Sequence, residues 1–164
     1  MQIVEKTVQP ATIADFLLVS AREAGELLTN LKLQKLLYYA QAWRLALTDE
    51  PLFSEDFEAW VHGPVLPSQY HRFKDFRWMP ITAPVDMPRV DEDLARHLDE
   101  ILRVFGPESA VALEQMTHEE RPWREARAGM PLHETSSAKI SKNTMKEYYR
   151  SLMDGEDQEG QARA

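Results

Sequence analysis

The five histidines of this sequence are the side chains whose chemistry best suits acid–base catalysis or metal binding. They are His62, His71, His97, His118 and His133. A metalloprotease helix places two histidines one turn apart, with a glutamate beside the first. His118 and Glu119 begin that pattern, but Pro122 stands where the second histidine should be. Because His62 and His71 lie nine residues apart on different predicted elements, we favour structural or solvated roles for all five.

Other short catalytic signatures do not occur in the sequence. The glycines are scattered and form neither a GxxxxGK[ST] nor a GxGxxG loop, and there is no GxSxG nucleophile elbow. The lack of cysteine removes disulfides, thiolate nucleophiles and thiolate-bound metals. The sequence thus predicts a protein that is not an enzyme and binds neither a cofactor nor a metal. An enzyme, hydrolytic or otherwise, that uses His62 or His71 with a nearby carboxylate is the least favoured alternative. It stays open because catalytic groups can converge from distant positions.

Arginine and tryptophan lie together in the segment 121–127. Arg121, Arg124 and Arg127 surround Trp123 in an otherwise acidic chain, and these two residue types are enriched at the energetic centres of protein interfaces. The alternative is that the arginines pair with neighbouring glutamates while Trp123 lies in the core. We favour this alternative.

The length and charge of the chain indicate a single domain that is poorly suited to nucleic acid. Its 164 residues suffice for one domain with a real core. The 27 acidic and 19 basic residues give a formal net charge of −8, whereas proteins that neutralise phosphates usually have the opposite balance. No apolar run could cross a bilayer, and the N-terminus lacks the build of a secretory signal. We expect a cytoplasmic protein with one domain over 1–153 and an acidic, disordered tail over 154–164.

The hydrophobic pattern predicts a mainly α fold, a compact single-domain helical bundle around a central helix. We expect helices over about 11–24 (capped by Thr12), 30–47, 67–74, 91–105 (capped by Asp91), 107–116, from Pro122, and from about 140. The helix over 30–47 has two apolar stripes on nearly opposite faces. The first contains Leu33, Leu36, Leu37, Ala40, Trp43 and Leu47, and the second Leu31, Tyr38 and Leu45. A helix that is apolar on two faces is packed on two sides, so we interpret it as the central helix; the alternative is that one face meets a partner.

The stretch EAWVHGPVLPSQY, residues 58–70, predicts a rigid corner with one or two short β segments. Gly63 before Pro64 disfavours a helix and allows unusual backbone angles, and Pro67 suits the start of a short helix. Trp60 and Tyr70 are the expected anchors on either side. The proline-containing segment 76–90 is expected to be irregular, with a β-bridge near 81–82.

Two adjacent stretches resemble a known family. They are LTNLKLQKLLYYAQAWRLAL, residues 28–47, and LFSEDFEAWVHGPVLPSQYHRFK, residues 52–74. They are similar to the Panacea-domain proteins, the group that contains SocA-type antitoxins and phage-associated GepA-like proteins. The matching features are the run from Lys32 to Tyr39, Phe57-Glu58-Ala59-Trp60, and Gly63-Pro64-Val65 followed by Tyr70; weaker ones are Pro122-Trp123 with Arg127, and residues 140–149.

This resemblance implies an antitoxin that binds and neutralises a cognate protein toxin encoded beside it, without enzymatic activity or a cofactor. SocA-type members are also proteolytic adaptors that deliver their toxin to the ClpXP protease. The resemblance identifies neither the toxin nor the oligomeric state. The alternative is a DNA-binding regulator of its own operon, for which Arg121–Arg127 and Lys139–Lys146 are the best basic segments.

We predict that basic and aromatic groups near the corner, the second helix and the arginine–tryptophan cluster bind the partner. The candidates are Lys32, Lys35, Tyr38, Trp60, His62, Gly63, Pro64, Val65, Tyr70, Arg121, Trp123 and Arg124. The two lysines could instead be solvated flanks of their helix.

Overall fold

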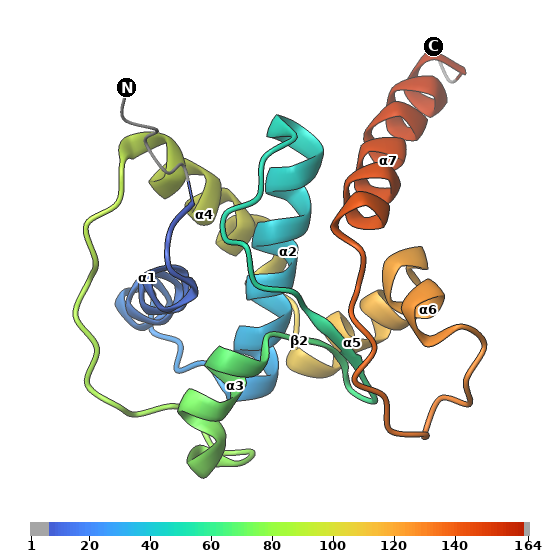
Figure 1. Cartoon of the computed structure of the whole chain (residues 1–164). Helices are drawn as coiled ribbons and strands as arrows, with labels where there is room; N and C mark the ends of the chain where they lie inside the picture. The colour runs from blue at the N-terminus through green and yellow to red at the C-terminus, as the bar shows by residue number, and fades with distance from the viewer. Residues whose placement is uncertain (1–6, 163–164) are drawn as a thin grey trace, which may run out of the picture.

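The computed structural model describes residues 7–162, which form a mainly helical fold with one small sheet (Figure 1). The elements along this part of the chain are α1 (Pro10–Glu23), α2 (Asn30–Thr48), β1 (Glu58–Trp60), β2 (Gly63–Val65), α3 (Pro67–Phe73), the 3-10 helix η1 (Lys74–Phe76), α4 (Glu92–Phe105), α5 (Ala110–Glu119), α6 (Arg121–Arg127) and α7 (Lys142–Ala162). The predicted fold class, a helical bundle with two short β segments, is confirmed. None of the helices in the described residues is both long enough and apolar enough to span a membrane.

Helix α2 lies at the centre of the bundle, as predicted. Thr29 Oγ1 accepts a hydrogen bond from Lys32 N (3.2 Å) and caps its start. Helices α1, α4, α5 and α7 all pack against it, and Figure 1 shows α2 between α4 and α7. Most residues of both apolar stripes are buried, which confirms the packing on two sides. Leu31 and Trp43 are partly buried, and Leu47 is 57% exposed because it lies in the last turn, at the edge of the core.

Three helix starts show how local capping decides the boundary. Asp91 caps α4 as predicted, and its Oδ1 accepts from Leu94 N (2.8 Å). The predicted cap at Thr12 is wrong: α1 begins at Pro10, since a proline without an N–H group suits the first helical turn. The helix predicted from Pro107 begins only at Ala110, because the Ser109 side chain caps it.

The last helix, α7, is longer than expected. Its N-terminus is capped by Ser141, whose Oγ accepts from Thr144 N (3.1 Å). The helical backbone continues to Ala162, through most of the segment 154–164 for which we predicted disorder. The division of the chain at residue 153 and the disorder of the segment after it stay predictions.

The two strands form an antiparallel hairpin that a third segment extends. Glu58 lies opposite Val65, and Trp60 opposite Gly63. On the other side of β1, the backbone of residues 138–140 pairs with residues 57–59. The sequence did not predict this third segment, which carries no strand-like alternation. The β-bridge predicted near 81–82 forms one residue earlier, between Thr29 and Pro80; the irregular segment then passes outside α1 on its way to α4 (Figure 1).

Candidate partner-binding site

The β1–β2 hairpin is held in place by buried side chains of other elements. A hairpin this short is not stable alone. Three donors from α2 and α6 each bond one of its carbonyl groups: Lys35 Nζ to Pro64 O (2.9 Å), Trp123 Nε1 to Trp60 O (2.9 Å) and Arg127 Nη1 to Ala59 O (3.0 Å). These residues all belong to the features on which the family resemblance rests. That pattern of residues therefore encodes the attachment of the hairpin to the bundle.

Lys35 occupies the tightest part of this attachment. Its side chain is fully buried, and desolvation lowers the pKa of its amine to about 7, against a smaller opposing effect of Glu114. Gly63 has a φ of 98°, and a Cβ added there would lie 2.7 Å from Lys35 Cε and 2.8 Å from Thr117 Oγ1. Only glycine fits this position without rearrangement. The interpretation of Lys35 as a solvated flank is wrong, because its amine is buried and donates to the Pro64 carbonyl instead of to water.

Arg127 and Trp123 close the hairpin from the α6 side. The Arg127 guanidinium lies 4.8 Å from the centre of the Trp123 ring, and both side chains are buried. Arg127 Nη2 also donates to the carbonyl groups of Pro131 (2.8 Å), Leu132 (3.3 Å) and Glu134 (2.6 Å). The structure confirms the favoured alternative for this cluster, in which Trp123 lies in the core. Pairing with a neighbouring glutamate holds for Arg121, which bonds Glu125 Oε2 (2.8 Å).

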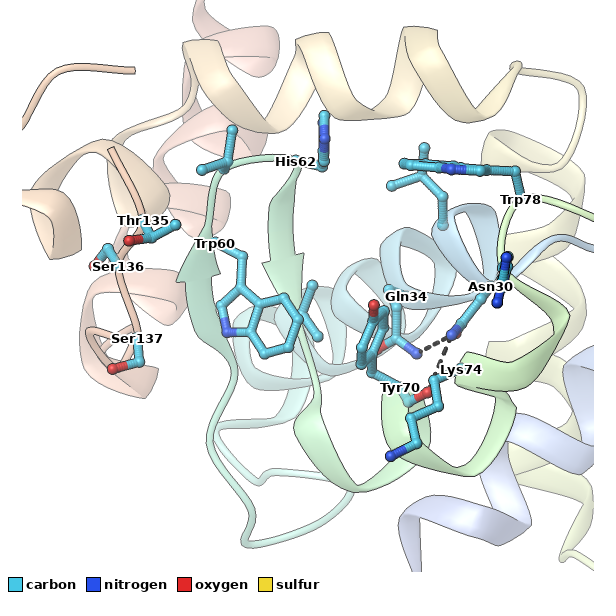
Figure 2. Close-up of a pocket in the computed structure, with 14 residues that line it drawn as sticks. Asn30, Gln34, Trp60, His62, Tyr70, Lys74, Trp78, Thr135, Ser136 and Ser137 are labelled. Carbon is cyan, nitrogen blue, oxygen red and sulfur yellow. Dashed lines mark hydrogen bonds between the residues drawn. The ribbon is translucent and has the colours of Figure 1, made fainter. Parts of the chain in front are cut away.

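The opposite side of the hairpin borders an open cavity of about 810 Å³ (Figure 2). Its lining comes from α2, the hairpin, α3, η1 and the loop before α7: Asn30, Leu31, Gln34, Trp60, Val61, His62, Val65, Tyr70, Lys74, Arg77, Trp78, Thr135, Ser136 and Ser137. Figure 2 shows Trp60 and Tyr70 pointing into the space between the hairpin and α3, with Trp78 and Ser137 at opposite ends. A cavity of this size, lined by aromatic rings and a few polar groups, is typical of a binding site.

Aromatic side chains form much of the cavity wall. The rings of Trp60 and Tyr70 meet edge to face with centroids 4.8 Å apart. His62 meets Trp78 in the same way at 5.9 Å. The Trp78 side chain is 71% exposed and its neighbour Met79 is 67% exposed. Exposed rings of this size beside a cavity mark a surface suited to binding.

An amide chain forms the polar floor of the cavity. Asn30 Nδ2 donates to Tyr70 O (3.1 Å), and Gln34 Nε2 donates to Asn30 Oδ1 (2.9 Å), as the dashed lines in Figure 2 mark. Gln34 Oε1 accepts from Leu66 N (2.9 Å). These bonds tie α3 and the end of the hairpin to α2, so the floor is fixed before any partner arrives.

His62 stands at the tip of the hairpin, where its Nδ1 donates to Glu114 Oε1 (2.6 Å). A carboxylate that orients an imidazole is an arrangement also used in acid–base catalysis. Here it joins the hairpin to α5 and sets one wall of the cavity. Among the described residues, no group of three or more histidine and carboxylate side chains is placed to hold a metal ion.

The predicted partner-binding residues fall into two sets. Four of them line the cavity: Trp60, His62, Val65 and Tyr70. The others lie elsewhere. Gly63 and Pro64 are buried within β2, and Lys35 and Trp123 are buried behind the hairpin. Lys32 and Tyr38 are buried along α2, whereas Arg121 and Arg124 are exposed on α6. The side chains of these buried residues have almost no exposed surface, and their part in partner binding stays a prediction.

Lys32 and Tyr38 have structural partners of their own. Lys32 Nζ donates to Gly106 O (2.7 Å) and pairs with Glu26 (2.6 Å), so the solvated-flank interpretation is wrong for it too. The Tyr38 hydroxyl lies 3.0 Å from that of Tyr149. This pair belongs to a buried network around the Glu120 carboxylate, which accepts from Tyr39 (2.6 Å) and Tyr149 (3.0 Å). Burial raises the pKa of Glu120, and the tyrosine hydrogen bonds partly offset that rise.

Several lining residues were not predicted. Lys74, Arg77 and Trp78 lie in or after η1, where the sequence has no periodicity, and the hydroxyl-bearing segment 135–137 is more than sixty residues from the hairpin in sequence. A tryptophan next to Met79 in an irregular, proline-containing segment was the one available signal, because large apolar residues are uncommon in solvated loops.

Comparison with known proteins identifies a family and a similar protein. The family described as "Antitoxin SocA-like, Panacea domain" matches residues 33–124, from α2 into α6. The protein named "Antitoxin SocA" from Caulobacter vibrioides (strain NA1000 / CB15N) is 32% identical, over 72% of this chain and 70% of that protein. No solved structure matches the chain.

Proposed function

Because the chain belongs to the family of SocA-like antitoxins with a Panacea domain, we propose that it neutralises a protein toxin by binding it directly. Such a function needs a partner surface and no catalytic centre. Most of the resemblance seen in residues 28–74 lies inside the matched region 33–124, and family membership is the observation that carries the proposal. The toxin is expected to be encoded by a neighbouring gene.

The open cavity beside the hairpin is the surface that we propose for toxin binding. It joins four of the residues that the sequence singled out, and its walls are fixed from behind by Lys35, Trp123 and Arg127. A pre-formed aromatic surface supports tight binding because little conformational entropy is lost when the partner docks.

Co-expression with the product of the neighbouring gene tests the function. We expect the two proteins to purify as a complex, and we expect this chain to restore growth that the neighbour alone arrests. If no complex forms and growth stays arrested although both proteins are made, the proposed function is wrong.

Delivery of the toxin to ClpXP is a finer proposal that rests on the similarity to Antitoxin SocA. It predicts that the toxin is degraded by purified ClpXP faster when this chain is present. An unchanged toxin half-life, together with normal growth rescue, would mean that the chain acts by blocking its toxin alone.

Operon regulation by DNA binding is a weaker candidate because most cations of its two basic segments already have acidic or carbonyl partners. Lys142 contacts Asp56 Oδ1 (2.5 Å), Lys146 contacts Asp49 Oδ1 (3.3 Å) and Arg121 pairs with Glu125. Neutralised cations release few counterions from DNA. A salt-sensitive gel shift with the chain's own promoter would nevertheless establish this function.

Hydrolysis through His62 and Glu114 is the remaining candidate. The 2.6 Å contact supplies an oriented imidazole. If His62→Ala left growth rescue intact, no catalytic role for this pair would be needed.

A further inference from the structure

The charge of the cavity is opposite to that of the chain. The sequence has 27 acidic and 19 basic residues, yet no aspartate or glutamate occurs among the described residues that line the cavity. Two cations, Lys74 and Arg77, lie in the lining and are exposed. Neither forms an ion pair within the described residues, whereas Arg72, two residues before Lys74, pairs with Asp15. The cavity is thus a small positive site on an acidic protein.

Two acidic side chains that contact the lining, Glu58 and Glu114, are already engaged by donors of the hairpin. Glu58 Oε1 accepts from Trp60 Nε1 (2.9 Å), and Glu114 Oε1 accepts from His62. These carboxylates are therefore held by donors of the hairpin and do not neutralise Lys74 or Arg77. The two cations are left to meet a negative group of a partner.

The internal hydrogen bonds make a small polar ligand a poor fit. The amides of Asn30 and Gln34 bond each other, Tyr70 O and Leu66 N, so few directional groups remain on the floor. Sites for small polar molecules rely on such precisely placed groups for orientation. What the cavity offers instead is aromatic surface beside uncompensated positive charge.

The β1 edge is closed to strand addition. It pairs with β2 on one side and with the segment around Lys139 on the other. A partner segment therefore has to bind through its side chains and not by extending the sheet at β1.

We propose that the cavity receives an acidic segment of the toxin. One large apolar side chain of that segment lies between Trp60, Tyr70 and Trp78, and flanking carboxylates pair with Lys74 and Arg77. Charge complementarity between two proteins favours the right partner and speeds encounter, while the aromatic wall supplies most of the affinity. This inference rests on the proposed function and names the part of the toxin that carries it.

Charge reversal in the full chain tests the inference. The double variant Lys74→Glu/Arg77→Glu is compared with Arg96→Glu/Arg103→Glu, which makes the same charge change at exposed positions of α4. The probe is the protein encoded by the neighbouring gene, and the readout is its dissociation constant at low and high salt. We expect the cavity variant to weaken binding at least about tenfold and to flatten its salt dependence, and the α4 variant to do neither.

Short overlapping peptides from the same probe protein locate the segment. We expect the peptides that bind to combine acidic residues with a large apolar one. Exchanging those acids for lysine in the full-length probe should abolish binding to the wild-type chain and restore it to Lys74→Glu/Arg77→Glu.

Each other outcome overturns the inference. If the wild-type chain binds the probe and both double variants bind equally well, the acidic segment is wrong and the antitoxin function stands. If the wild-type chain does not bind the probe, the acidic segment and the antitoxin function are both wrong. Binding of a single-stranded oligonucleotide that Lys74→Glu/Arg77→Glu abolishes would assign the cavity to nucleic acid, and a dimer that Trp78→Ala dissociates would assign it to a second copy of the chain.

Discussion

The two sides of the hairpin contrast in how their polar groups are satisfied. Behind it, Lys35, Trp123 and Arg127 each donate to a buried carbonyl group. In front of it, Trp60 and Trp78 border an open cavity. Buried polar groups are costly unless they are paired, so the closed side determines the structure. The open side is free to vary with the partner.

The residues that make the sequence recognisable occur on both sides of the hairpin. Lys35 and Gly63 lie on the closed side, whereas Trp60 and Tyr70 line the open cavity. Substitutions on the two sides should accordingly have different consequences, large for stability behind the hairpin and large for binding in front of it.

Loss of Arg127 should give the largest change in stability. Arg127→Met removes the donor to four carbonyl groups while keeping much of the side-chain volume, so we expect the free energy of unfolding to fall by about 3 kcal/mol or more. Urea denaturation measures it. The exposed neighbour Arg124 is the control, and Arg124→Met should change stability by less than about 0.5 kcal/mol. Similar effects of both substitutions would contradict the buried attachment.

Gly63→Ala should destabilise by about 2 to 3 kcal/mol, because strain at positive φ adds to the overlap with Lys35 and Thr117. Gly25→Ala is the matched control: its φ is 89°, and nothing lies within 4 Å of an added Cβ. It should cost about 1 kcal/mol. If thermal or urea unfolding showed the same loss of stability for both substitutions, the close contact of residue 63 with Lys35 and Thr117 would not contribute to stability.

Lys35 should make stability depend on pH. Its pKa is about 7 in the folded chain against 10.5 in the unfolded chain, so the unfolded state binds more protons between these values and stability rises with pH across that window. From pH 7 to pH 9 the gain should be about 2 kcal/mol. Lys35→Met should lack this rise. If both chains show the same pH profile, the amine is not buried in the way described.

Trp78→Ala should have the smallest effect on stability, within about 0.5 kcal/mol, because its side chain is largely exposed. A much larger loss would mean that the open side, too, holds the fold together. The same substitution should impair growth rescue by the chain, which separates binding from folding.

Sequence patterns could predict the central helix and the corner because each depends on local periodicity or on glycine and proline. They could not predict that Lys35 is buried, since lysine is almost always exposed. The tertiary structure alone shows that the Lys35 amine donates to a hairpin carbonyl group instead of to water. The positions of Lys74, Arg77 and Trp78 were equally hidden, because tertiary packing alone brings their irregular segment to the hairpin.

The affinity of Trp78→Ala for the protein encoded by the neighbouring gene tests the central claim most directly. The control is Leu47→Ala, a comparably exposed apolar residue outside the cavity. The account predicts that Trp78→Ala raises the dissociation constant at least about tenfold while Leu47→Ala leaves it unchanged. Unchanged affinity for Trp78→Ala would contradict the assignment of the toxin-binding surface to the open side of the hairpin.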